Sequence, residues 1–214
     1  SIQAIESMDQ KWSVRTKEAA PPFSATQLIV TTPSHRWESL PLPTGIATTL
    51  QANPLPPHPP VATLVLGFHR TQINHPLDGF GVLMPPIEKF PILGAIFSSS
   101  IFPYRAPKDH VALMIFLGGV TRPDAALWDQ TTATQNALQA LRPLLGIEGN
   151  PSFIHHTQWA QAIPQYNLNH NTFLQAITAV HKQHPGFHLA GSFCGGPGLN
   201  DCIQSALNLA QEIY

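Results

Sequence analysis

The stretch LAGSFCGGPGLNDCIQSALNLA, residues 189–210, decides the fold at the C-terminal end of the chain. It joins the end of a short apolar strand at 187–191, a glycine-rich loop that runs to Gly198, and a helix that continues to the end of the chain. Glycines let the backbone approach a ligand closely, and a helix N-terminus offers unpaired N–H groups to an anion. By itself this pattern is more often a tight turn, with Asn200 or Asp201 as the helix cap.

Upstream of this stretch, apolar residues at helical spacing predict two further helices. The first spans 123–146 and the second spans 171–184, where a Pro-Gly pair ends it. Apolar runs bounded by proline or glycine predict strands. These strands are expected at 61–69, 79–86, 92–102, 110–119 and 153–159. Their spacing is typical of an antiparallel sheet with one packed face and one face that is available to a ligand.

The N-terminal region is predicted to be rich in strands. Segments 2–5 and 11–15 form a hairpin, and the β-branched run at 27–33 forms a third strand that stops at a proline. A proline-rich segment follows at 41–60, with a short helix expected at 44–52. We interpret this segment as a connection between two lobes.

The composition limits the class of protein. Hydrophobic residues make up 43% of the chain and charged residues 11%, against about 25% charged in an average soluble domain. The chain is therefore expected to be globular rather than disordered. Its net charge is -1 and its 11 Lys and Arg residues are scattered, which argues against nucleic-acid binding. No apolar run reaches the roughly 18 residues of a membrane span.

The cysteines and histidines do not indicate a metal site. We expect Cys194 and Cys202 to form a reduced thiol pair rather than a disulfide. His181, His184 and His188 have spacings that resemble those of metal ligands, but they lie on both sides of a Pro-Gly pair. They also lack a Cys or carboxylate partner, so we predict no bound metal.

The sequence of residues 189–210 is more specific than its pattern of turn and helix. It resembles the C-terminal flavin motif of protoporphyrinogen oxidases, a family within the amine-oxidase-like flavoproteins. Three further segments resemble the same family, in the family's order. They are HPLDGFGVLMP at 75–85, ILGAIFSSSIFP at 92–103, and AIPQY at 162–166 after Trp159.

The resemblance implies an FAD-dependent oxidoreductase of haem biosynthesis. Members of the family oxidise protoporphyrinogen IX to protoporphyrin IX in a six-electron dehydrogenation, and oxygen re-oxidises the FAD. The residues that match the family's substrate-binding positions are Phe80, Gly81, Leu83 and Phe116. Those that match its flavin contacts are Pro197, Gly198 and Leu199, with Trp159 as a further flavin neighbour. No catalytic residue is predicted, because the cofactor carries the redox chemistry.

The chain also departs from the family. No three glycines have the G-x-G-x-x-G spacing that holds the FAD pyrophosphate, and the helical segment that docks the family on the membrane is absent. We therefore expect the C-terminal part of such an enzyme, inactive and weak in FAD binding without the N-terminal half. Two alternatives stay open. One is a stand-alone, non-catalytic module that binds a tetrapyrrole or a partner, and the other is an amine-oxidase-like flavoprotein such as a carotenoid desaturase.

The expected fold is α+β. An antiparallel substrate-binding sheet with a packed helix is predicted at 46–165, and residues 1–45 and 166–214 are predicted to form the C-terminal part of a Rossmann-like FAD-binding domain. The expected partner is a tetrapyrrole substrate, with no nucleic acid and with membrane contact only through the absent segment. A homodimer is expected through the surface that the N-terminal half would cover. The full-length enzyme is expected in the cytoplasm, peripheral to the inner membrane.

Overall fold

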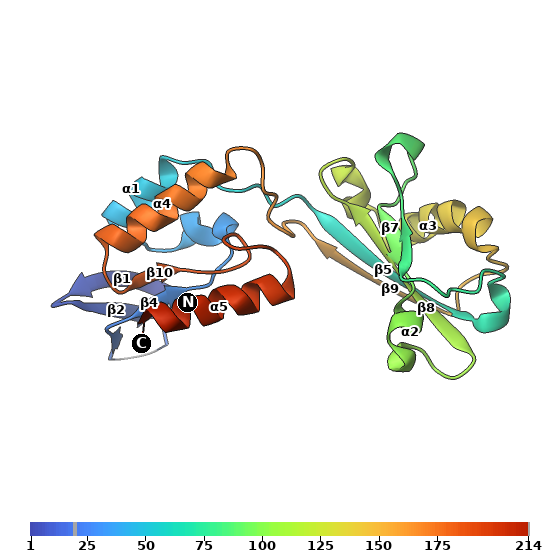
Figure 1. Cartoon of the computed structure of the whole chain (residues 1–214), viewed down its shortest axis with the longest axis horizontal. Coiled ribbons are helices and arrows are strands. Elements are labelled where there is room, and N and C mark those ends of the chain that lie inside the picture. Colours follow the sequence, from blue (N-terminus) through green and yellow to red (C-terminus); the bar gives the residue numbers. More distant parts are fainter. Residues whose placement is uncertain (19–20, 214) are drawn as a thin grey trace. The chain divides into compact units, whose positions relative to one another are not determined.

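The computed structural model describes residues 1–18 and 21–213, and they divide into two compact units (Figure 1). Unit 1 contains Ser1–His58 and Ile163–Tyr214, and unit 2 contains Pro59–Ala162. Each unit has its own hydrophobic core. The two are therefore described separately.

The borders between the units differ from the predicted ones. The sequence patterns place them at 45/46 and 165/166, whereas the structure divides the chain after residues 58 and 162. The first difference arises from α1 (Thr44–Gln51), because its Ile46 and Leu50 are buried in the core of unit 1. The short helix therefore belongs to unit 1 rather than to unit 2.

Unit 2 is built on a five-stranded antiparallel sheet with the order β6–β7–β8–β5–β9. Its strands are β5 (Val61–His69), β6 (Gly81–Leu83), β7 (Gly94–Ile96), β8 (His110–Gly118) and β9 (Phe153–Trp159). β5 and β8 pair over nine residues, from Val61 opposite Gly118 to His69 opposite His110. Both contain β-branched and aromatic residues, which favour strands. The predictions of long strands for β5, β8 and β9 are confirmed.

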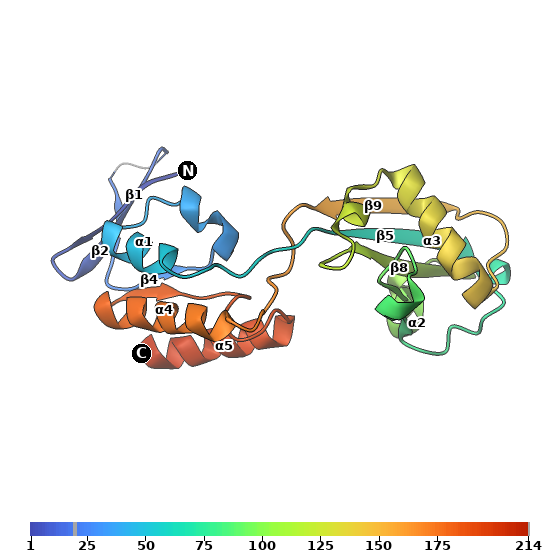
Figure 2. The same cartoon turned by 90° about the horizontal axis from the view of Figure 1, so that it is seen from above.

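One face of this sheet is covered and forms the core of unit 2. Side chains alternate along β5, so that Ala62, Leu64, Leu66 and Phe68 are fully buried while Val61, Thr63, Val65 and Gly67 are half-buried. The helix α3 (Gln130–Leu145) lies against the sheet, as Figure 2 shows. Its apolar residues recur at helical spacing and join the same core.

Local chemistry sets the ends of α3. The Asp129 side chain accepts a hydrogen bond from the backbone N–H three residues later at 2.7 Å, and Gly146 ends the helix with φ +60°. The single helix predicted at 123–146 is therefore wrong at its start. The 3-10 turn η5 (Pro123–Leu127) is a separate element, and Trp128 after it is extended.

A short helix, α2 (Ser98–Ile101), replaces the second half of the strand predicted at 92–102. This helix contacts β8, where Ser99 Oγ accepts a hydrogen bond from the Ala112 N–H at 3.0 Å. The hydroxyl oxygen of Ser99 thus accepts a hydrogen bond that the backbone carbonyl of a neighbouring strand would otherwise accept from β8. The remaining 3-10 turns are η1 (Ser34–Ser39), η2 (Arg70–Gln72), η3 (Pro86–Glu88) and η4 (Pro103–Arg105).

Unit 1 combines a three-stranded meander, a parallel pair of strands and three helices. The meander is β1 (Ile2–Met8), β2 (Lys11–Thr16) and β3 (Phe23–Ala25), and the parallel pair is β4 (Leu28–Val30) and β10 (Phe187–Leu189). The helices are α1, α4 (His170–Gln183) and α5 (Leu199–Ile213). Aromatic side chains dominate the core, which contains Trp12, Trp37, Phe173, Phe187 and Phe193.

The helix α5 is packed more loosely than α1 and α4. Those two lie side by side on one side of the β4–β10 pair, and α5 lies on the other side (Figure 1). A cavity of about 590 Å³ lies between α5 and β4, with Ile29 and Leu209 in its lining. No residue of α5 that the structure describes is fully buried, and Ile203 and Leu207 are more than half exposed.

Replacing Leu141 of α3 with alanine should lower the free energy of unfolding of unit 2 by about 2–5 kcal/mol, because the change leaves a cavity at a fully buried position. The matched control is Leu144→Ala on the same helix, where the side chain is 42% exposed. Its loss should stay below about 0.5 kcal/mol. Hydrogen exchange of the β5 and β8 amides in increasing urea measures both values. Equal losses would contradict the assignment of the buried face.

Candidate functional site

The uncovered face of the five-stranded sheet is the first candidate site. Directly opposite residues on neighbouring antiparallel strands lie on the same face. One row across the sheet consists of Leu83, Gly94, Phe116, Thr63 and Thr157, and the next consists of Gly81, Ile96, Met114, Val65 and His155. These residues alternate with the buried ones of β5 and β8, so they face away from the core. The open face is therefore largely apolar.

Three of the four predicted substrate-binding residues, Gly81, Leu83 and Phe116, lie on this open face. The Leu83 side chain is 82% exposed, and Phe116 is half-buried. Gly94 stands between them on β7 and has no side chain, and a Cβ there would lie 2.5 Å from the Val82 carbonyl oxygen, so the pairing with β6 itself requires this glycine. An apolar row of this kind, with an aromatic ring in it, suits a flat apolar ligand.

Phe80 and Gly81 occupy the start of the edge strand β6. The Phe80 side chain is 70% exposed, and its carbonyl oxygen accepts a hydrogen bond from the Phe97 N–H at 3.0 Å. Gly81 is required by the sheet itself, since a Cβ there would collide with the carbonyl oxygen of Ala95. The packing explains this glycine without a ligand, and the binding roles of the four residues stay predictions.

The glycine-rich loop between β10 and α5 is the second candidate site, and it lies in unit 1. Tyr166 holds the loop at two points. Its hydroxyl donates to the Ser192 carbonyl oxygen at 2.5 Å and accepts from the Gly196 N–H at 3.0 Å. The Tyr166 ring also stacks on His170, with 3.9 Å between the ring centroids. One hydroxyl thus links two parts of the loop backbone and sets its path.

Asp201 determines what the start of α5 can bind. The helix begins at Leu199, so Asn200 and Asp201 lie inside it and the prediction that one of them is its N-cap is wrong. Asp201 lies in the first turn, and its Oδ2 accepts a hydrogen bond from the Gly198 N–H at 3.2 Å. A Cβ at Gly196 would lie 2.5 Å from the same oxygen. The loop therefore needs glycine where it passes the carboxylate.

This arrangement fits one part of a dinucleotide cofactor. The Asp201 carboxylate occupies the helix N-terminus, where it would repel a pyrophosphate. Pro197, Gly198 and Leu199 are exposed, so their backbone can approach an uncharged ring. The carboxylate can accept a hydrogen bond from a sugar hydroxyl. The residues present thus fit the ring and sugar portion of FAD and do not fit its pyrophosphate.

The remaining predicted flavin contact lies in the other unit. Trp159 is the last residue of β9, is 45% exposed and stands opposite Val61 on the open face of unit 2. The predicted cofactor-binding residues are therefore divided between the two units. Their shared role stays a prediction.

Burial shifts the pKa values of two titratable groups near the loop. It raises the pKa of the Cys194 thiol to about 11, so this thiol stays protonated near neutral pH and is not an activated nucleophile. Burial also lowers the pKa of His170, which favours the neutral ring. The Nε2 atom of His170 has no hydrogen-bond partner among the residues that the structure describes. Within residues 1–18 and 21–213, no group of three or more His, Cys, Asp or Glu side chains is placed to hold a metal ion.

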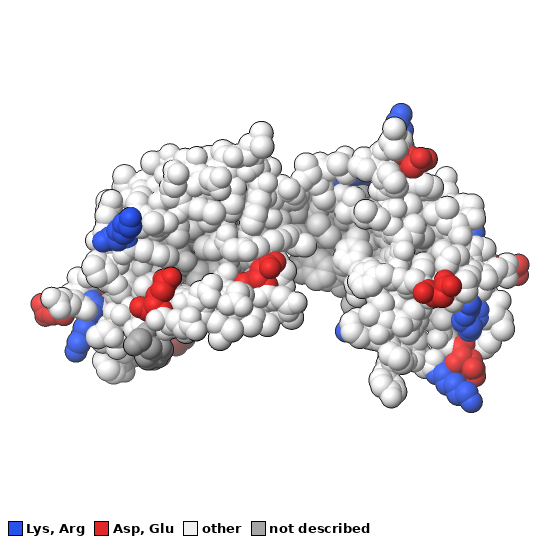
Figure 3. Space-filling model, in the orientation of Figure 1, with Lys and Arg blue, Asp and Glu red and all other residues white. Residues whose placement is uncertain are grey.

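Charged side chains are scattered over the face shown in Figure 3, and no basic patch gathers there. Residues 1–18 and 21–213 contain no helix that is both long and apolar enough to cross a membrane.

Sequence reasoning missed two residues at these sites. Gly94 is important because of its place between Leu83 and Phe116, which depends on strand register rather than on any local pattern. Tyr166 lies in the AIPQY segment, but its partners Ser192 and Gly196 are 26 and 30 residues away. The only signal for Tyr166 was its membership of a segment that resembles the family.

Comparison with known proteins gives a consistent result. A family model described as flavin containing amine oxidoreductase matches residues 4–214. The chain is 34% identical over 157 residues to a mitochondrial protoporphyrinogen oxidase of Nicotiana tabacum. This alignment covers 72% of this chain and 31% of that protein. It is 24% identical over 144 residues to a coproporphyrinogen III oxidase of Bacillus subtilis, covering 67% of this chain and 31% of that protein. The chain thus spans about a third of the length of these relatives.

Solved structures share the fold. A crystal structure from Exiguobacterium sp. 255-15, assigned to the protoporphyrinogen oxidases, matches with a TM-score of 0.78 at 23% identity, over 99% of this chain and 46% of that one. A putrescine oxidase bound to putrescine matches with a TM-score of 0.68 at 11% identity, over 99% and 47%. The predicted α+β class is confirmed.

Replacing Tyr166 with phenylalanine should speed hydrogen exchange at the Gly196 amide roughly two- to tenfold, because one hydrogen bond contributes about 0.5–1.5 kcal/mol. The ring and its stacking on His170 are kept. Tyr104→Phe, at a fully exposed side chain, is the control and should change nothing at Gly196. Unchanged exchange in the Tyr166 variant would show that the hydroxyl does not hold the loop.

The alkylation rate of Cys194 should keep rising with pH toward about 11, because burial raises its thiol pKa to that value and only the thiolate reacts. The variant Cys202→Ser leaves Cys194 as the single thiol, since the chain has two cysteines. Iodoacetamide labelling followed by mass spectrometry measures the rate. A midpoint near the value of about 8.5 for a free cysteine would contradict the burial.

Proposed function

The chain belongs to the flavin containing amine oxidoreductase family, and we propose that it forms the substrate-binding sheet and the flavin-side loop of a porphyrinogen oxidase. The proposed reaction is the six-electron, oxygen-dependent oxidation of protoporphyrinogen IX to protoporphyrin IX in haem biosynthesis. The observation that carries this proposal is the apolar open face, where Leu83, Gly94 and Phe116 form one row across the sheet.

The open face suits a tetrapyrrole because this substrate is a large, flat and mostly apolar ring. Neighbouring strands are about 4.8 Å apart, so the backbones of Leu83 on β6 and Phe116 on β8 stand about 10 Å apart across Gly94. Ile96 and Met114 continue the apolar surface in the next row. A ring that rests on this surface would contact Phe116 and exclude water from that contact.

In this proposal the residues of the chain bind and orient the cofactor and the substrate. FAD, when bound, supplies the electron acceptor for the oxidation. Tyr166 keeps the loop in the path that lets Pro197, Gly198 and Leu199 approach the flavin ring with their backbone. Asp201 accepts a hydrogen bond from the sugar of the cofactor. The open face holds the macrocycle and keeps water from its underside.

We also propose that a part of the protein outside residues 1–214 holds the FAD pyrophosphate. The G-x-G sequences at 79–81 and 196–198 have Met84 and Asp201 where a pyrophosphate-binding turn needs its third glycine. The Asp201 carboxylate at the start of α5 adds a charge that disfavours phosphate there. This chain alone should therefore bind FAD weakly. The proposal retains the peripheral membrane location that the resemblance implies and the homodimer that is expected through the surface that the N-terminal half would cover.

A non-catalytic tetrapyrrole-binding module is the second candidate function. The same open face supports it, and so does the poor fit of the loop to a pyrophosphate. The two candidates differ in what they need. The oxidase requires FAD and turns over substrate in the longer protein, whereas the binding module does neither.

Titration of this chain with protoporphyrin IX should show binding with a micromolar Kd, and titration with FAD should show none in that range. Quenching of tryptophan fluorescence reports the porphyrin, because Trp159 lies on the open face. Leu83→Ala and Phe116→Ala should each weaken porphyrin binding roughly tenfold, since each removes apolar contact area. Leu144→Ala on α3 is the control and should leave the Kd unchanged.

Three outcomes would count against the proposal. Tight FAD binding by this chain would mean that the loop accepts the pyrophosphate after all. Porphyrin binding that is insensitive to Leu83→Ala and Phe116→Ala would exclude the open face as the site. A longer protein that binds porphyrin and FAD but oxidises no porphyrinogen would favour the binding module.

A further inference from the structure

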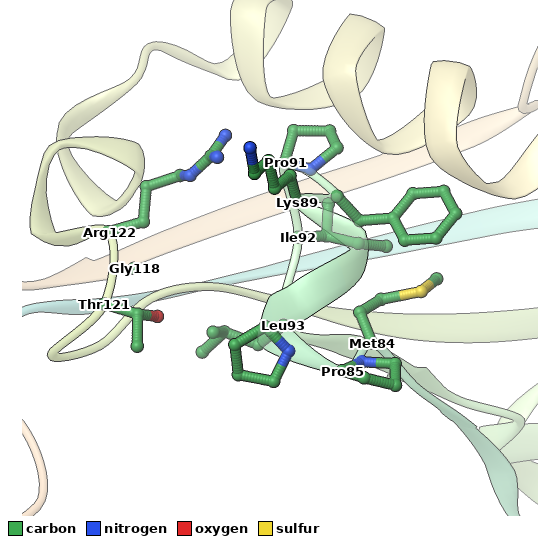
Figure 4. Close-up of a pocket in the computed structure, with 11 residues that line it drawn as sticks. Met84, Pro85, Lys89, Pro91, Ile92, Leu93, Gly118, Thr121 and Arg122 are labelled. Carbon is green, nitrogen blue, oxygen red and sulfur yellow. The ribbon is translucent and has the colours of Figure 1, made fainter.

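A cavity of unit 2 lies between the β6–β7 connection and the turn after β8. Its volume is about 120 Å³, several times the roughly 10–15 Å³ that a single water requires. The residues that line it include Met84, Lys89, Ile92, Leu93, Thr121 and Arg122. Figure 4 shows Lys89 and Arg122 extending from different segments, with both cationic ends on the same side of the cavity.

The two cations have no acidic partner among the residues that the structure describes. Ion pairs within 4.0 Å occur there only in unit 1, so Lys89 and Arg122 form none. Glu88 and Asp124 are close to them in the sequence and do not pair with them either. The chain has only 11 Lys and Arg residues in 214, so two of them at one small cavity concentrate its scarce positive charge.

The cavity has an apolar and stiff wall opposite this charge. Met84 and Ile92 are buried and join the core of unit 2. Prolines stand at 85, 86 and 91, and each restricts the backbone of the β6–β7 connection. Lys89 has φ +56°, a left-handed conformation that a lysine rarely adopts. The connection therefore restricts the backbone that carries Lys89, whose side chain is exposed at the cavity.

We propose that this cavity binds the carboxylate of a small apolar acid. The guanidinium of Arg122 offers paired N–H donors that match the two oxygens of a carboxylate, and the Lys89 ammonium adds a second positive charge. Met84 and Ile92 offer contact to a short hydrocarbon tail. The proposal does not depend on the porphyrinogen oxidase function, because the cavity is lined by none of the residues assigned to the tetrapyrrole.

The methionines of the chain provide a direct test. The chain has three, and carbon-13 labelling of their methyl groups gives one NMR signal for each. Met84 lines the cavity, Met114 lies on the open face, and Met8 is 62% exposed on β1. Titration with butyrate should shift the Met84 signal with a Kd in the millimolar range and leave the other two in place. A shift of Met114 without Met84 would overturn the proposal.

Charge-removing variants test the two cations separately. Lys89→Gln and Arg122→Gln should each weaken butyrate binding roughly tenfold, because each removes a charge-assisted hydrogen bond. The matched control is Lys108→Gln, an exposed lysine of unit 2 outside this cavity, and it should bind butyrate as the unchanged chain does. An unchanged methyl spectrum without ligand confirms that each variant is folded. Butyrate affinity that is equal in all three variants would overturn the proposal.

Two further ligands test the chemical class. Butanol has the tail without the charge, and sulfate has the charge without the tail. Butyrate should bind more tightly than either. If butanol shifts Met84 equally well, the cavity is only an apolar hollow. If sulfate does so, it is only a site of positive charge, and either result would overturn the assignment of a carboxylate on an apolar tail.

Discussion

The nine-residue pairing of β5 with β8 is the constraint on which unit 2 depends. Side chains alternate along both strands, so this register decides which residues join α3 in the core and which form the open face. A slip by one residue would bring Thr63 and Val65 into the core and expose Leu64 and Leu66. One end of the pairing is set by Gly118, where a Cβ would lie 2.6 Å from the Pro60 carbonyl oxygen. The core and the open face both follow from this one alignment.

Much of the fold could be predicted because its signals are local. The long apolar strands β5 and β8 and the amphipathic helices α3 and α4 carry their periodicity in the sequence, and each was found near its true bounds except at the start of α3. The helix α2 could not be found in this way. Its serines interrupt an apolar run, and the hydrogen bond from the Ala112 N–H to Ser99 Oγ that holds it exists only in the folded sheet. The border at α1 depends in the same way on packing in unit 1.

The sequence singled out residues of both candidate sites but not their arrangement, and the binding roles of these residues stay predictions. The resemblance selected Leu83 and Phe116, but only strand register shows that Gly94 stands between them. It also selected residues 197–199, at the end of the glycine-rich loop and the start of α5, but the clamp on this loop is formed by Tyr166, which is distant in the sequence. Long-range hydrogen bonds of this kind have no local signature. A prediction from spacing therefore finds the loop and not what holds it.

The loose packing of α5 affects the local stability of unit 1. A helix without a fully buried side chain contributes little to the hydrophobic core, so we expect α5 to unfold locally at a lower free-energy cost than the rest of unit 1. Tyr166 holds the loop just before α5, so we expect this local unfolding to stop at the loop and not to reach β10. A ligand that contacts both β10 and α5 would hold α5 against the rest of unit 1. Its binding would therefore slow the local unfolding of α5.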